Sequence, residues 1–230
     1  MKIEIKGAIV SNDDAWIYEY FEMECTTPKM VNQALEKAKG EDIEVVINSG
    51  GGSVFAGSEI YTALKSYNGK TEGKIVGVAA SAASVIAMGV KFLQISPAAH
   101  IMTHRASTYG EGNKNDMQKT VGMLDGIDQS IANVYLIKTG MSQQELLSMM
   151  DKETWLTAQQ AKELGFVDAI MFEDEVQAVA SADVGGLLPQ SVINKIRNEF
   201  RKEPEAKDKE EKAKQEELEV AKAKLKLALV

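Results

Sequence analysis

The sequence predicts an α/β protein in which helices pack on a largely parallel sheet. Short apolar runs typical of buried strands alternate with segments of helical spacing, first at residues 43–47 and 56–67 and again at 74–78 and 81–88. Repeated strand–helix units with short links place successive strands side by side in the same direction. With 44% hydrophobic residues, a chain of 230 residues is long enough for one such domain.

The elements in the first half of the chain follow from these units. Glycines 50–52 supply a turn between the first strand and its helix. In chain order we expect strands at residues 43–47, 74–78 and 92–95, helices at 56–67 and 81–88, and a strand-like run at 101–103.

Three helices are expected in the second half. Apolar residues recur every three or four positions over residues 115–138, and Gly140 then supplies a stop. Ser142 with Glu145 three residues later has the spacing of a capping box and starts a helix that runs to Met150. Thr157 caps the last helix, over residues 157–164.

A change in composition predicts two parts. Residues 1–184 read as the folded domain, and residues 185–230 begin with a Gly- and Pro-containing link and continue as mixed runs of Lys and Glu. We expect this tail to form a solvated helix, with pairing to itself or to a partner protein as the alternative.

Composition also excludes several classes of function. A net charge of −8 argues against a nucleic-acid surface, and no apolar run is long enough to span a membrane. Cys25 is the single cysteine, so an intramolecular disulfide is excluded and a cysteine-based zinc site is disfavoured. We expect a cytoplasmic protein with no cofactor and no metal.

Ser81 is the candidate nucleophile, because it stands between a strand and a helix after the small residues 77–80. A serine hydroxyl needs an imidazole to take its proton, and the chain has two histidines, His100 and His104. His104 ends the strand-like run and is the preferred base. The alternatives are a tight helix–sheet contact around Ser81 and a metal-binding histidine pair, which is disfavoured because spacing of four suits a helix.

Two further groups are needed for serine hydrolysis. The glycines at 50–52 allow a backbone N–H to approach a substrate carbonyl and to complete an oxyanion hole with the N–H of Ala82, although a plain turn or a phosphate loop is the alternative. Asp151 and Glu153 are both candidates for the carboxylate that orients the imidazole. The acidic residues of the long helix, among them Asp128, are expected on its exposed face.

Four ordered motifs together resemble the Clp protease proteolytic subunit family, and most closely its phage-encoded head maturation members. They are Ile47-Asn48-Ser49-Gly50-Gly51-Gly52, Gly77-Val78-Ala79-Ala80-Ser81, Met102-Thr103-His104 and Trp155-Leu156-Thr157-Ala158. The resemblance extends from about Ile43 to Ile170 and covers most of the domain.

The resemblance implies a crotonase/ClpP-like spiral of ββα units with a long protruding helix. It implies Ser81 as nucleophile, His104 as base, and the N–H groups of Gly51 and Ala82 as the oxyanion hole. Glu153 stands where the family carries the aspartate of its triad, so the acid is Glu153 or Asp151. The family assembles into homo-oligomeric rings, but the segment before Ile43 does not match the loops that dock an ATPase, which makes an ATPase partner doubtful.

The function expected from these residues is that of a serine endopeptidase of phage head maturation, acting on capsid or scaffold proteins in the host cytoplasm or the assembling prohead. The alternatives are a scaffolding protein with little proteolytic activity and a crotonase-like acyl-CoA enzyme, for which a Ser81–His104 pair is superfluous.

Overall fold

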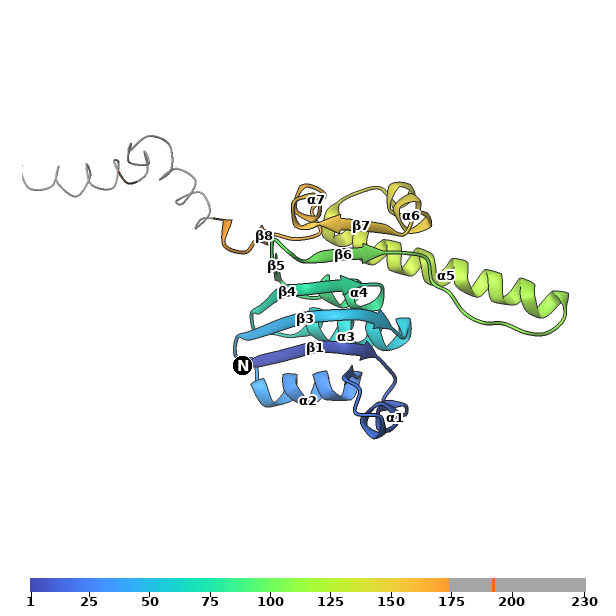
Figure 1. Cartoon of the computed structure of the whole chain (residues 1–230), viewed down its shortest axis with the longest axis horizontal. Coiled ribbons are helices and arrows are strands. Elements are labelled where there is room, and N and C mark those ends of the chain that lie inside the picture. Colours follow the sequence, from blue (N-terminus) through green and yellow to red (C-terminus); the bar gives the residue numbers. More distant parts are fainter. Residues whose placement is uncertain (174–191, 193–230) are drawn as a thin grey trace, which may run out of the picture. The chain divides into compact units, whose positions relative to one another are not determined.

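Over residues 1–173, the computed structural model shows a mostly parallel sheet of eight strands (Figure 1). The strands are β1 (Lys2–Ile9), β2 (Cys25–Thr26), β3 (Ile43–Gly52), β4 (Thr71–Ala80), β5 (Phe92–Ile95), β6 (His100–Thr103), β7 (Thr154–Thr157) and β8 (Ala169–Ile170). Their order is β2-β1-β3-β4-β5-β8, with β6 beside β4 and β7. Every pairing is parallel except the antiparallel pair β6 and β7. The expected α/β class is confirmed.

Helices follow most of the strands and cover one face of the sheet. They are α1 (Ala15–Tyr20), α2 (Pro28–Ala38), α3 (Val54–Ser66), α4 (Ala82–Ala87), α5 (Lys114–Thr139), α6 (Gln143–Asp151) and α7 (Ala158–Glu163). The long helix α5 extends away from the sheet in Figure 1. The structure describes residues 1–173 and Val192, so the expected tail at 185–230 lies outside the described residues apart from that one residue. Residues 1–172 form one compact unit.

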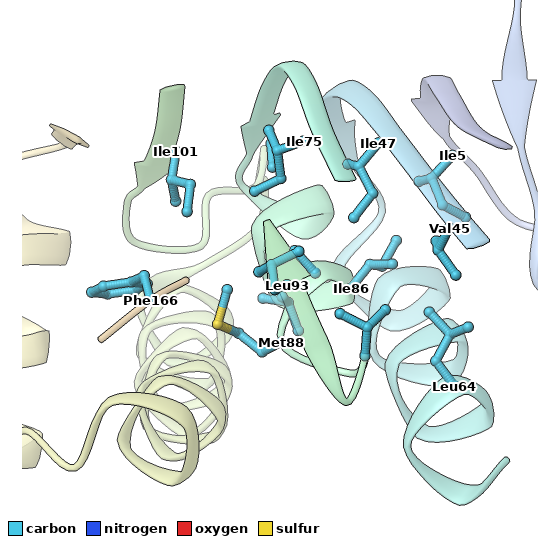
Figure 2. Close-up of a cluster of buried hydrophobic side chains, with 14 of the residues drawn as sticks. Ile5, Val45, Ile47, Leu64, Ile75, Ile86, Met88, Leu93, Ile101 and Phe166 are labelled. Carbon is cyan, nitrogen blue, oxygen red and sulfur yellow. The ribbon is translucent and has the colours of Figure 1, made fainter. Parts of the chain in front are cut away.

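The core lies between the sheet and the helices, where side chains of β1, β3 and β4 meet those of α3 and α4 (Figure 2). In β1, Ile3 and Ile5 are buried while Lys2 and Glu4, which alternate with them, are exposed, because successive side chains of a strand point to opposite faces. The opposite face carries cross-strand ion pairs such as Lys74 with Glu44. The alternation therefore sets which face the helices cover.

Element ends follow the expected capping chemistry. Ser142 and Thr157 both form capping boxes, and Gly140 ends α5 in the left-handed conformation. The sequence assigned no strand between the helix that ends at Met150 and the one that begins at Thr157, but residues 154–157 form strand β7, which pairs with β6. No described helix is both long and apolar enough to cross a membrane.

β4 determines where the functional side chains meet. Its first half pairs with β5, through Glu72 to Ile75, and its second half pairs with β6, through Val78 to Ala80. A single strand therefore changes neighbours, and the strand ends of β3, β4 and β6 come together at one edge. Ser81 follows β4 directly and His104 follows β6 directly.

Candidate active site

Ser81 occupies a sharp turn between β4 and α4. Its φ is 54° and its ψ is −125°, a combination that a non-glycine residue adopts at a cost of about 1–3 kcal/mol. Ser81 is the N-cap residue of α4, yet its side chain makes no capping hydrogen bond. The hydroxyl is therefore directed away from the helix that it precedes and is available to another group.

That group is the imidazole of His104. The Nε2 atom of His104 lies 2.8 Å from the Oγ atom of Ser81. The backbone brings the two residues together, because the N–H of Ser81 donates to the carbonyl of Met102 on β6. His100, the other histidine, lies exposed at the opposite end of β6. The structure thus places one of the two histidines within reach of the serine.

Hydrogen bonds from α4 and α5 hold the turn that carries Ser81. The carbonyl of Ser81 accepts from the N–H groups of Ser84 and Val85 and from the Oγ of Ser84 at 2.6 Å. The Oγ of Ser84 also lies 2.7 Å from the hydroxyl of Tyr135 on α5. A serine hydroxyl has one proton, and Ser84 gives it to Ser81, so Tyr135 is the donor in the second bond. Sequence reasoning missed both residues, because each reads as an ordinary helix position.

The glycines of β3 lie against the same turn. A Cβ atom on Gly51 would lie 2.7 Å from the Cβ of Ser81 and 3.0 Å from the nitrogen of Ala82, so only glycine permits this approach. Ala82 is the first residue of α4, and its N–H has no carbonyl partner one turn earlier. The N–H of Gly51 donates to the Oγ of Ser49 at 3.1 Å. Both expected oxyanion donors therefore lie next to Ser81, but that of Gly51 is engaged by a side chain.

Neither candidate carboxylate is hydrogen-bonded to His104. Asp151 accepts from Nε of Arg105 at 2.7 Å, and this bond lowers the pKa of the Asp151 carboxyl. Glu153 accepts from the indole N–H of Trp155 at 3.4 Å. The antiparallel pairing of β6 with β7 ends where Thr103 lies opposite Thr154, so His104 and Glu153 are the residues that adjoin this last pair.

A third carboxylate, which sequence reasoning placed on the exposed face of the long helix, is buried. Asp128 on α5 is 4% exposed, because it faces the segment that follows His104 rather than solvent. It accepts from the N–H of Ala106 at 2.8 Å and from Nη1 of Arg105 at 3.2 Å. The expectation for Asp128 was wrong because one turn of a helix can face a neighbouring loop, which periodicity does not reveal.

A cleft of about 410 Å³ opens over the Ser81–His104 pair. The cleft is lined by both polar and apolar residues. They are Gly50, Gly52, Ser53, Val54, Phe55, Ser81, Ala82, Val85, Met102, His104, Arg105, Ala106, Ser107, Ile131 and Tyr135. Within the described part of the chain, no group of three or more His, Cys, Asp or Glu side chains is arranged to hold a metal ion.

A serine hydroxyl on a strained strand-to-helix turn, in contact with an imidazole nitrogen and beside the backbone N–H groups of Gly51 and Ala82, is the arrangement of a serine hydrolase. The chain belongs to the Clp protease family, whose family model matches residues 22–174, and it is a serine peptidase of that family.

Three curated relatives illustrate the similarity. The chain is 34% identical over 139 residues to the ATP-dependent Clp protease proteolytic subunit 1 of Chlamydia abortus, covering 58% of this chain and 71% of the relative. It is 31% identical over 165 residues to the protein of the same name from Chlamydia muridarum, covering 66% and 85%. It is 30% identical over 136 residues to the ATP-dependent Clp protease proteolytic subunit of Bacteroides fragilis, covering 58% and 66%.

Proposed function

We propose that this chain hydrolyses peptide bonds with Ser81 as nucleophile and His104 as general base. The observation that carries the proposal is the 2.8 Å contact between Ser81 Oγ and His104 Nε2 on a strained turn. Nε2 takes the hydroxyl proton while Oγ attacks the scissile carbonyl, and it then gives that proton to the leaving amine. Water hydrolyses the acyl-enzyme by the same path in reverse.

The developing oxyanion is stabilised by the N–H groups of Ala82 and Gly51. The position of Gly51 supports this role, and its N–H would exchange the Oγ of Ser49 for the substrate oxygen. Since a backbone N–H donates to one strong acceptor at a time, substrate binding and the Ser49 contact compete.

Glu153 is the carboxylate that we propose orients His104. Its support is its position next to Thr154, the strand partner of Thr103, which precedes His104, and the engagement of Asp151 by Arg105. Glu153 Oε1 must then leave the Trp155 indole for the imidazole, and a contact of 3.4 Å is weak enough to be exchanged. Glu153→Gln is expected to slow acylation roughly a hundredfold or more, and Asp151→Asn only a few-fold. The opposite ranking would assign the role to Asp151.

A fluorophosphonate probe tests the nucleophile, because it reacts only with an activated serine. The wild-type protein is expected to be labelled at Ser81, located by mass spectrometry of tryptic peptides. Ser81→Ala is expected to abolish labelling and peptide cleavage while leaving the thermal unfolding curve unchanged. Peptidase activity retained in Ser81→Ala would refute the assignment.

For the substrate, we propose capsid or scaffold proteins of an assembling phage head, on the sequence resemblance to head maturation members. The Clp protease family degrades proteins within oligomeric rings, and the relatives above are named ATP-dependent. We propose that this chain cleaves without an ATPase. Both proposals can be tested by incubating the purified protein with an assembled prohead and, separately, with unfolded casein. Cleavage of casein without cleavage of prohead proteins would contradict the proposed substrate. Cleavage that occurs only when an ATPase is added would contradict the proposed independence from an ATPase.

A further inference from the structure

Asp128 is a buried charged residue that the proposed mechanism does not use. Its side chain lies on α5, and both carboxylate oxygens have partners. Oδ1 accepts from the N–H of Ala106 at 2.8 Å, and Oδ2 accepts from Nη1 of Arg105 at 3.2 Å. Arg105 and Ala106 are the two residues that follow His104 in the chain. Both partners of Asp128 therefore belong to the segment that carries the base.

This segment lies beyond the last paired residue of its strand. β6 ends at Thr103, so no ladder hydrogen bonds of the sheet hold residues 104–106. A segment without such bonds has more conformations available. The position of the His104 imidazole is therefore only as well defined as the backbone that carries it. The hydrogen bond from Ala106 to Asp128 supplies the missing anchor.

The same helix also anchors the nucleophile. Asp128, Ile131, Ala132 and Tyr135 are the buried residues of α5, at the spacing of one helix face. Tyr135 donates to Ser84, which donates to the carbonyl of Ser81. Two residues about two turns apart on one face of α5 thus hold the two catalytic segments: Tyr135 holds the serine turn and Asp128 holds the histidine segment.

We propose that Asp128 is a positioning residue for the catalytic base, which it holds against Ser81 by anchoring the backbone of Ala106 and the side chain of Arg105. The proposal rests on the roles given above to Ser81 and His104. Arg105 also contributes by neutralising the charge of Asp128, because a buried carboxylate without a cation would be strongly disfavoured. The Nε of Arg105 is held by Asp151, so the guanidinium that neutralises Asp128 is itself fixed in place.

Three variants separate the parts of this role. Asp128→Ala removes the acceptor for Ala106 and the partner of Arg105. Asp128→Asn keeps an oxygen that can accept from Ala106 but removes the charge. Asp125→Asn is the matched control, because Asp125 lies one turn earlier on α5 and is exposed.

The measurements are kcat and KM for a short peptide substrate, the rate of fluorophosphonate labelling, the melting curve and the oligomeric state. Asp128→Ala is expected to lower kcat and the labelling rate roughly tenfold or more, with KM within about threefold, because a displacement near 1 Å of a catalytic group has an effect of this size. Asp128→Asn is expected to recover most of that loss, and Asp125→Asn is expected to match the wild-type protein. A role confined to folding would shift the melting curve and leave kcat per folded enzyme unchanged.

Each outcome decides the matter. A folded Asp128→Ala with wild-type kcat and labelling rate would overturn the inference while leaving Ser81 as the nucleophile. If Asp128→Ala does not fold, Asp128→Glu is measured in its place, since the longer side chain keeps the charge but shifts the hydrogen-bond acceptor. Wild-type kcat in both Asp128→Glu and Asp128→Asn would then overturn the inference as well. A wild-type protein that is not labelled at Ser81 would instead refute the proposed function on which the inference rests.

Discussion

The hydrogen bond between Tyr135 and Ser84 predicts a change in stability on substitution of Tyr135 that reverses its sign with pH. Tyr135 is 1% exposed and Ser84 is fully buried, and the Tyr135 hydroxyl donates to Ser84 Oγ at 2.7 Å. The perturbation is Tyr135→Phe, which removes one hydroxyl and keeps the ring that packs against Phe166.

Near neutral pH the loss is that of one buried hydrogen bond. Ser84 keeps its donation to the carbonyl of Ser81, so Tyr135→Phe leaves no donor without a partner. A cost of about 1 kcal/mol in the free energy of unfolding is expected. Ser84→Ala is expected to cost more, about 1–3 kcal/mol, because it leaves the Tyr135 hydroxyl buried without an acceptor. The double variant is expected to lose less free energy of unfolding than the two single variants lose together.

At high pH the wild-type protein carries a penalty that Tyr135→Phe lacks. Burial raises the pKa of Tyr135 from 10.0 to about 12. Between these values the unfolded chain releases the phenol proton and the folded protein retains it. The stabilising contribution is thus complete below pH 10 and is lost as the pH rises toward 12, at about 1.4 kcal/mol for each pH unit. Over the whole interval, the wild-type protein loses about 3 kcal/mol of stability relative to Tyr135→Phe.

The assay is urea unfolding of both proteins at matched concentration and oligomeric state, at neutral pH and at several pH values above 10. Wild type is expected to be the more stable protein at neutral pH and the less stable one near pH 12. A difference in free energy of unfolding that stays constant over this range would show that Tyr135 is ionised equally in the folded and unfolded chain. The reasoning about its buried donor role would then be wrong.

Three other predictions concern stability. Thr103→Val is expected to stabilise the protein by about 1 kcal/mol in urea unfolding, because Thr103 Oγ1 is buried without a hydrogen-bond partner among the described residues; a loss of stability would indicate a partner such as a buried water. Gly51→Ala is expected to abolish labelling by fluorophosphonate and to lower the melting temperature, since its Cβ would meet a backbone oxygen at 2.6 Å at a φ of +96°, whereas Gly50→Ala meets nothing within 4 Å and serves as the control. The hydrogen bond from Lys74 lowers the pKa of Glu44, so the stability that Glu44 contributes is present above its unfolded value of 4.5 and is lost as the pH falls below it; Glu44→Gln should flatten this part of an acid titration followed by circular dichroism.

Local patterns predicted much of the fold in the second and third quarters of the chain. Helix α5 follows from apolar spacing, and its end follows from Gly140, because both signals are set by neighbours within a turn. The first 42 residues received no assigned element, although Thr27 and Pro28 carry the start signal of α2. Strand β7 was missed because its residues lie between two expected helices and include the cap of the second, and because its identity depends on pairing with β6.

For the site, the sequence by itself determined which residue types were available. With one serine on a glycine- and alanine-rich strand-to-helix junction and two histidines in the chain, elementary acid–base chemistry points to Ser81 and to His100 or His104 as its base, with His104 preferred. Only the tertiary structure decided the rest: which histidine reaches the serine, which carboxylate Arg105 engages, and that Asp128 faces the loop behind His104. These contacts join residues 23 to 46 positions apart, and a contact over that range depends on strand order and helix orientation, which no local pattern encodes.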